Sequence, residues 1–202
     1  MISEKNSIAV PKLKPIRTTP LYKNLRDLMN GAAEMYGEDN AFIIKTKRAT
    51  KEKPAEYRYR TFIDFRNDAV AFGTGLMKMG LKGKRLAVIG KNCYEWVVTY
   101  FAQVSGLGII VPLDKDLPVE ELRYSMKKAG ISAIVFDKER DAVVREAMNC
   151  DELESIQLIS MNDTEGAVSF TEILESGKII VHIRVQRDVM DDAAGKSKRV
   201  LF

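Results

Sequence analysis

The stretch GKRLAVIGKNCYEWVVTYFAQVSGLGIIVPLD, residues Gly83–Asp114, decides the fold of this chain of 202 residues. Its first part, Arg85–Ile89, is a short apolar run between glycines, which is typical of a strand buried on both faces. Apolar residues then recur at helical spacing over Tyr94–Val104, and a second apolar run, Ile109–Val111, closes at Pro112. Strand, helix and strand predict one βαβ unit, whose functional loops follow the carboxyl ends of its strands. We expect Asn92 to cap the helix.

Two helices and a hairpin are expected before this unit. Asn24–Tyr36 has the pattern of an amphipathic helix, with a predicted buried stripe of Leu25, Leu28, Ala32 and Tyr36. Ala41–Lys45 and Tyr57–Arg60 are the predicted strands of the hairpin. The lysine-rich segment 46–56 joins them without an interleaved aromatic residue, so we interpret it as a solvated loop rather than a nucleic-acid patch.

A second helix is expected to begin after Thr61, which is its predicted N-cap. Asp64 stands three residues later, where a carboxylate completes a capping box. Apolar residues at helical spacing continue to Met79, and Gly80 ends the helix.

After the βαβ unit the same rhythm continues. Apolar runs at Ser132–Phe136 and Ile156–Ile159 are separated by helical patterns, so four strands begin about one βα unit apart. This alternation predicts an α/β fold, an open and mainly parallel sheet with helices on both faces. Beyond residue 160 the signal weakens: Phe170–Glu175 is a predicted short helix, and 179–185 fits a strand or a helix equally. We divide the chain into an extended arm (1–23), an α/β subdomain (24–187) and a polar tail (188–202).

Composition limits the classes of function. Hydrophobic residues make up 46% of the chain and charged residues 30%, with a net charge of +4 that does not require a nucleic-acid partner. Cys93 and Cys150 are expected to be reduced thiols, and the N-terminus has no apolar signal-peptide region, which favours a cytoplasmic location. The arm is basic, so peripheral contact with an anionic membrane is the alternative to a solvated leader; its charges are Lys5, Lys12, Lys14 and Arg17.

No complete catalytic constellation is present. Gly195-Lys196-Ser197 imitates the end of a P-loop, but Met190 stands where the first glycine is needed. Gly90 follows a strand without the remaining glycines of a dinucleotide fingerprint. His182 is the only histidine, and no Cys–His cluster has metal-ligand spacing. We therefore expect no catalytic and no metal-ligating residue in this chain.

Three segments carry a resemblance to adenylate-forming enzymes. Tyr59–Phe65 resembles their first core motif and Phe101–Asp114 resembles the second, while Gly83–Trp96 is similar to the long-chain acyl-CoA synthetase branch. The resemblance covers roughly residues 20–160. It implies the N-terminal subdomain of that fold and an AMP-forming acid–thiol ligase. Such an enzyme joins a fatty acid or other carboxylate to AMP, using ATP and Mg²⁺, and transfers the acyl group to coenzyme A (CoA).

The sequence departs from the family beyond these segments. The Ser/Thr/Gly-rich phosphate loop of the third core motif, the later ribose-binding aspartate and the C-terminal lysine are missing. We therefore expect an N-terminal piece whose last residues, Val200-Leu201-Phe202, would lead toward that loop. Such a piece is expected to be inactive alone, to bind no cofactor tightly and to self-associate through an uncovered apolar face.

The resemblance also implies where CoA would lie. In related ligases its nucleotide end covers loops that follow parallel strands, and here those loops contain Lys115, Lys138 and Arg140. Their charges suit phosphate groups, although exposed surface charge is an alternative interpretation. Two other functions stay open at this point: part of an adenylation domain of the peptide-synthetase type, and a non-catalytic interaction module with the same fold.

Overall fold

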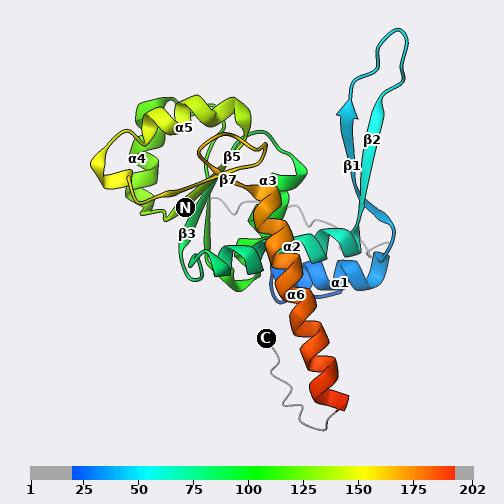
Figure 1. Cartoon of the computed structure of the whole chain (residues 1–202). Coiled ribbons are helices and arrows are strands. Elements are labelled where there is room, and N and C mark those ends of the chain that lie inside the picture. The colour runs from blue at the N-terminus through cyan, green and yellow to red at the C-terminus, as the bar shows by residue number, and fades with distance from the viewer. Residues whose placement is uncertain (1–19, 194–202) are drawn as a thin grey trace, which may run out of the picture.

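The computed structural model describes residues 20–193 (Figure 1). The predicted arm lies outside the described residues up to position 19, and the predicted tail does so from position 194, including Gly195-Lys196-Ser197. The helices are α1 (Leu25–Tyr36), α2 (Phe62–Lys78), α3 (Tyr94–Ala102), α4 (Val119–Ala129), α5 (Asp141–Ala147) and α6 (Phe170–Ala193). Shorter helical turns are Gln103–Leu107, Lys138–Arg140 and Asp151–Leu153.

The main sheet has five strands in the order β4-β3-β5-β6-β7, and every neighbouring pair is parallel. The strands are β3 (Arg85–Ile89), β4 (Ile109–Pro112), β5 (Ala133–Phe136), β6 (Gln157–Ser160) and β7 (Val168–Ser169). The four predicted strands are confirmed in place and direction. The fifth was missed because two residues carry no periodicity.

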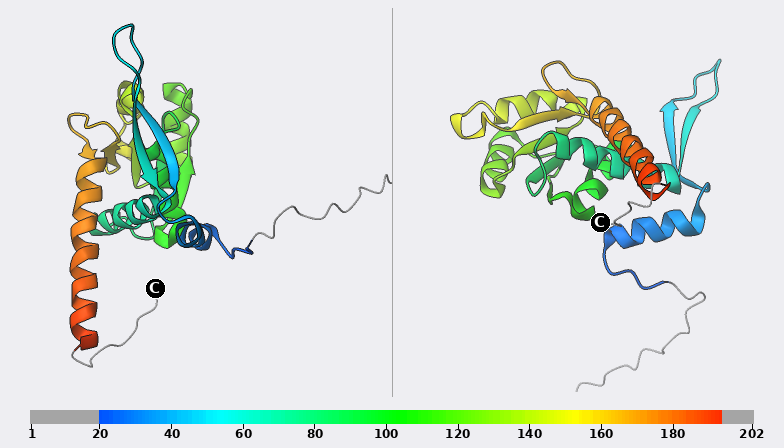
Figure 2. Two further views of the ribbon diagram at one scale, coloured as in Figure 1. Left: turned by 90° about the vertical axis from the view of Figure 1, so that its right-hand side faces the viewer. Right: turned by 60° about the horizontal axis from the view of Figure 1, so that its bottom comes forward.

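Side chains of the central strands alternate between two apolar layers. Leu86 and Val88 of β3 join a cluster with residues of α2, α3 and α6, while Ala87 and Ile89 join a second cluster with α4 and α5. All four side chains are fully buried. Helices therefore cover both faces of the sheet, as the continuous apolar runs predicted (Figures 1 and 2).

The starts of α2 and α3 differ in how they are capped. Thr61 and Asp64 form the predicted capping box, with two reciprocal backbone–side-chain bonds of 3.1 Å. For α3, Asn92 is not the N-cap. That position belongs to Cys93, which makes no side-chain cap bond, because the preceding residues form the turn that leaves β3. At its other end α3 continues into a π-helical turn that contains the fully buried Gln103, whose side-chain amide has no hydrogen-bond partner among residues 20–193.

The burial of α1 corrects the sequence prediction. Its buried residues are Met29 and Ala33, whereas Leu25, Leu28 and Tyr36 of the predicted stripe are 36–47% exposed. The apolar side chains of this helix cover a wider part of its circumference than the part that contacts the body. The helix packs through the side that carries the small Ala33, and half of this apolar part is left at the surface.

A hairpin stands away from the body (Figures 1 and 2). It pairs β1 (Asn40–Lys47) with β2 (Glu56–Thr61) in antiparallel fashion, so the predicted hairpin is confirmed with longer strands. One of its faces packs on the first apolar cluster through Phe42 and Ile44. The ring of Phe42 lies 5.1 Å from Phe65 and 5.2 Å from Tyr94, which fixes the base of the hairpin.

α6 is one continuous helix. It is longer than the predicted short helix Phe170–Glu175, and it shows that segment 179–185, which fitted a strand or a helix, is helical. It also continues past residue 188, where the polar tail was predicted to begin. Its N-terminal part crosses α2, and its C-terminal part extends beyond the body (Figures 1 and 2). The crossing is close because glycines face it. A Cβ atom on Gly177 would overlap the carbonyl oxygen of Ala71, and one on Gly75 would overlap that of Ile173.

This close approach is tested by two glycine substitutions. Gly177→Ala is expected to lower the free energy of unfolding by about 1–3 kcal/mol, because the added methyl group forces the two helices apart. Gly73→Ala is the matched control, since its Cβ would lie in ordinary contact, 3.6 Å from the Cβ of Ala102. The control should be neutral or stabilising by up to about 1 kcal/mol, because alanine favours a helix. Urea denaturation measures the free energy of unfolding of both variants. Equal changes in the two would contradict the close approach of α2 and α6 at Gly177.

Candidate functional site

Four loops meet at one edge of the sheet. Because all strands of this sheet run in parallel, the segments that follow β3, β4, β5 and β6 emerge at their shared carboxyl edge. This edge brings together the three residues predicted from the sequence, Lys115, Lys138 and Arg140. It adds Lys91, which sequence reasoning missed although it too follows directly on a strand and its closing glycine.

Asp137 ties two of these loops together. It is buried, with 8% exposure, and its Oδ2 accepts a hydrogen bond of 2.7 Å from the backbone N–H of Lys91. Its Oδ1 accepts one of 3.1 Å from the backbone N–H of Arg140. Gly90 makes room for this carboxylate: its φ is +140°, and a Cβ there would lie 2.7 Å from Oδ2. The loops after β3 and β5 are therefore held at a fixed spacing.

The three predicted residues differ in how their charges are used. Lys115 is exposed and pairs with Asp116 at 2.5 Å, and this hydrogen bond raises the pKa of Lys115. Arg140 donates from Nη2 to the carbonyl oxygen of Leu117 at 2.5 Å, so it joins the loops after β4 and β5. The ammonium group of the exposed Lys138 has no hydrogen-bond or ion-pair partner within residues 20–193.

Acidic side chains balance most of this basic charge. Lys91 pairs with Glu139 at 2.5 Å, and the loop after β4 carries Asp114 beside the pair already described. An anionic ligand at this edge would therefore meet one uncommitted cation, Lys138, and two lysines that must first exchange a carboxylate partner. The arrangement suits weak, charge-assisted binding of phosphate groups rather than a tight site.

Other candidate chemistry is not supported within the described part of the chain. His182 is exposed on α6, with its Nε2 3.5 Å from Nε2 of Gln186. Residues 20–193 contain no group of three or more His, Cys, Asp or Glu side chains placed to hold a metal ion. No helix in this range is both long and apolar enough to cross a membrane.

A buried polar network connects three helices. The hydroxyl of Tyr94 on α3 donates a hydrogen bond of 2.8 Å to Asp68 on α2. Lys178 on α6 lies 3.5 Å from the other carboxylate oxygen of Asp68. Burial is the main cause that raises the pKa of Tyr94, and its bond to Asp68 adds to the effect. The network secures α6 to the body, away from the carboxyl edge.

With this fold and edge described, the class of protein follows. The chain belongs to the family of AMP-binding enzymes, whose sequence model matches residues 31–194. The members of this family are AMP-forming ligases.

Particular relatives refine the picture. A mitochondrial medium-chain acyl-CoA ligase (ACSF2) from Bos taurus is 35% identical over 80 residues, which are 39% of this chain and 13% of that protein. The long-chain-fatty-acid–CoA ligase ACSBG2 from Rattus norvegicus is 19% identical over 96% of this chain and 29% of its own length. The chain thus spans less than a third of each of these curated relatives.

Solved structures agree on the fold. The anthranilate CoA ligase AuaEII, solved in complex with anthranoyl-AMP, matches 78% of this chain and 29% of its own chain, with a TM-score of 0.62 and 23% identity. A long-chain-fatty-acid CoA ligase from Rhodopseudomonas palustris, described as putative, matches 74% of this chain and 36% of its own, with a TM-score of 0.63 and 19% identity. The α/β sheet described above is therefore that of adenylate-forming enzymes.

The role of Asp137 is tested by removing its carboxylate. Asp137→Ala is expected to lower the free energy of unfolding by about 1–3 kcal/mol, because the backbone N–H of Lys91 loses its acceptor, whereas that of Arg140 keeps the backbone carbonyl oxygen of residue 137 at 3.0 Å. Glu139→Gln is the control in the same loop. It removes an exposed ion pair and should cost less than about 1 kcal/mol. Urea denaturation of both variants decides, and an Asp137→Ala protein as stable as the control would contradict the assignment.

Cys93, at the start of α3, supplies a test based on pH. Burial raises the pKa of its thiol from an ordinary 9.0 to about 11. At pH 8 in a Cys150→Ser background, Cys93 should therefore react with iodoacetamide about a hundredfold more slowly than a free thiol, and at an ordinary rate in urea. Because the folded state holds the proton more tightly, the stability contributed by this thiol is present below pH 9 and is lost toward pH 11. A fast reaction of the folded protein at pH 8 would refute the burial of this thiol.

Proposed function

We propose that this chain is the N-terminal part of an AMP-forming acid–thiol ligase that activates a fatty acid and transfers it to CoA. The observation that carries the proposal is the AMP-binding family match over a parallel sheet of the adenylate-forming type. Long-chain fatty acids are the proposed substrates, supported by the named activity of the rat relative that aligns along 96% of this chain. A cytoplasmic location is part of the proposal and rests on composition alone.

The chemistry of such a ligase is activation by a good leaving group. A carboxylate oxygen attacks the α-phosphorus of ATP and pyrophosphate leaves, which converts a poor electrophile into an acyl-adenylate. A thiol then attacks the acyl carbon and AMP leaves. The Ser/Thr/Gly-rich loop of the family is missing from this sequence, so neither step is assigned to residues of this chain.

What these residues would contribute is an edge of the CoA site. The uncommitted ammonium group of Lys138 is the proposed contact for a phosphate of the nucleotide end. Arg140 would act through the loop, since its guanidinium already donates to the carbonyl oxygen of Leu117 and its Nε is buried without a partner among the described residues. Lys115 would join only after exchanging Asp116 for a phosphate.

This proposal is tested by titrating CoA into the chain and into Lys138→Gln. Loss of one exposed charge-assisted contact should weaken binding by about fivefold, and added salt should weaken it further. The control Lys82→Gln removes another exposed lysine, from the loop between α2 and β3, and should have no effect. Equal affinities for all three proteins would remove Lys138 from the site.

Ligase chemistry is tested separately. The chain alone, given ATP, Mg²⁺ and a long-chain fatty acid, should release no pyrophosphate above background, because it lacks the phosphate loop. Release would contradict the proposed dependence on further segments while leaving the ligase assignment intact. In a full-length ligase that contains this segment, Lys115→Ala or Arg140→Ala should raise the CoA concentration needed for half-maximal rate.

A further inference from the structure

The outer part of the β1–β2 hairpin is exposed to solvent. Only its base contacts the body, and its outer part projects into solvent (Figures 1 and 2). The tip is an ordered turn. The N–H of Thr50 donates to the carbonyl oxygen of Lys53 at 2.9 Å, and Thr50 Oγ1 accepts bonds from the N–H groups of Glu52 and Lys53.

The tip is strongly basic. Residues 45–53 contain five basic side chains and a single acidic one, Glu52. Lys47 is paired with Glu56 across the strands at 2.9 Å. Arg48, Lys51 and Lys53 are exposed and have no ion-pair partner among residues 20–193. The positive charge at the tip is therefore available to a partner.

Strand pairing places tyrosines beside these lysines. Ile43 lies opposite Tyr59, and Lys45 lies opposite Tyr57, so the four side chains share the outer face of the hairpin. Ile43 is 64% exposed, Tyr59 53% and Tyr57 45%. The ammonium group of Lys45 lies 5.7 Å from the centroid of the Tyr57 ring. The segment that looked free of aromatic residues in sequence is thus part of a mixed basic and aromatic surface.

Three kinds of partner for this surface are compared by its charge and residue types: a second copy of the chain, a nucleic acid and a lipid bilayer. A second copy of the chain would bring two basic tips together, and like charges would oppose that contact. A nucleic acid would stack its bases on ring faces, but Lys45 already covers the ring of Tyr57, and the aliphatic Ile43 offers nothing to a base. A bilayer with anionic lipids accommodates all three residue types: cations at phosphates, tyrosines at the interface and isoleucine at the acyl boundary.

We propose that the outer face of the β1–β2 hairpin docks on the surface of an anionic lipid bilayer. Lys51, Lys53 and Arg48 supply the attraction to lipid phosphates, and Ile43 and Tyr59 enter the interfacial region. This docking is independent of the proposed ligase activity, because none of these residues belongs to the carboxyl edge of the sheet.

Sedimentation of the chain with vesicles tests the charge contribution. Binding is expected to phosphatidylcholine vesicles that contain phosphatidylserine, and not to phosphatidylcholine alone. Each cation near such a surface adds about a fivefold gain in affinity, so Lys51→Gln/Lys53→Gln should weaken binding by about tenfold or more. The control Lys82→Gln/Lys84→Gln removes the same charge beyond the C-terminal end of α2, whereas the hairpin joins its N-terminal end. The control should change binding by less than twofold.

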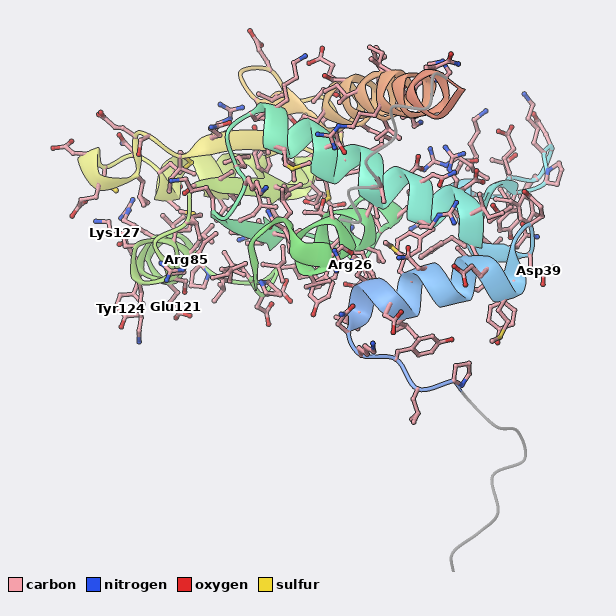
Figure 3. All side chains as sticks on the ribbon, turned by 90° about the horizontal axis from the view of Figure 1, so that it is seen from below. Arg26, Asp39, Arg85, Glu121, Tyr124 and Lys127 are labelled. Carbon is pink, nitrogen blue, oxygen red and sulfur yellow. The ribbon has the colours of Figure 1, made fainter. Side chains whose placement is uncertain are left out.

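A second pair of variants tests the apolar contribution. Ile43→Ser/Tyr59→Ser should weaken binding to the same vesicles by about tenfold, with the fold checked by circular dichroism. The control Tyr124→Ser removes a tyrosine of 62% exposure from α4, at the opposite end of the molecule from Asp39, which directly precedes β1 (Figure 3). Equal effects of control and hairpin variants would overturn the proposal.

Two further results would also overturn it. One is binding of RNA or DNA that is tighter than vesicle binding and is lost in the same hairpin variants. The other is a concentration-dependent dimer, seen by analytical ultracentrifugation, that the same variants abolish.

Discussion

The structure depends on the burial of β3 and β5 on both faces. A parallel strand with an apolar layer on each side cannot face water, so helices must cover it above and below, and each connection must cross from one edge of the sheet to the other. The odd and even residues of Arg85–Ile89 divide between the two clusters accordingly. This single constraint also places all loops that follow the strands at one edge, which is where a ligand site of this fold class is built.

At that edge the buried carboxylate of Asp137 holds the loops together more than the exposed cationic side chains do. Asp137 accepts from backbone N–H groups of two loops, and Gly90 leaves it room. The basic side chains are mostly committed to acidic neighbours or to backbone carbonyl groups, as Lys115 and Arg140 are. For the proposed CoA edge, such an arrangement would position a phosphate-bearing ligand without holding it strongly.

Two elements extend beyond this core. The hairpin and the outer part of α6 project from the body, and each carries apolar side chains that the described residues leave exposed, such as Ile43 and Ile183. The relatives with the same fold are several times longer than the matched segment. The hairpin differs from α6 in its concentration of positive charge, which is why an anionic surface is its proposed partner.

Much of the architecture could be predicted from the sequence because the deciding signals are local. Apolar runs of strand length, the Thr61 capping box and glycines at helix ends each act within a few residues. They specified four parallel strands and the covering helices, whereas the three cationic candidates at the carboxyl edge came from the resemblance to related ligases. The two-residue β7 was missed because it is too short to show a period.

Tertiary structure decided which partners these elements meet. The sequence of α1 holds a wide apolar arc, and only packing chose Met29 and Ala33 as its buried part. Lys91 and Asp137 are 46 residues apart, so their hydrogen bond is invisible until β3 and β5 pair. The same holds for Lys45 and Tyr57, which share a face only through antiparallel pairing. Local periodicity determines what an element is, whereas contacts between distant segments determine what its side chains can do.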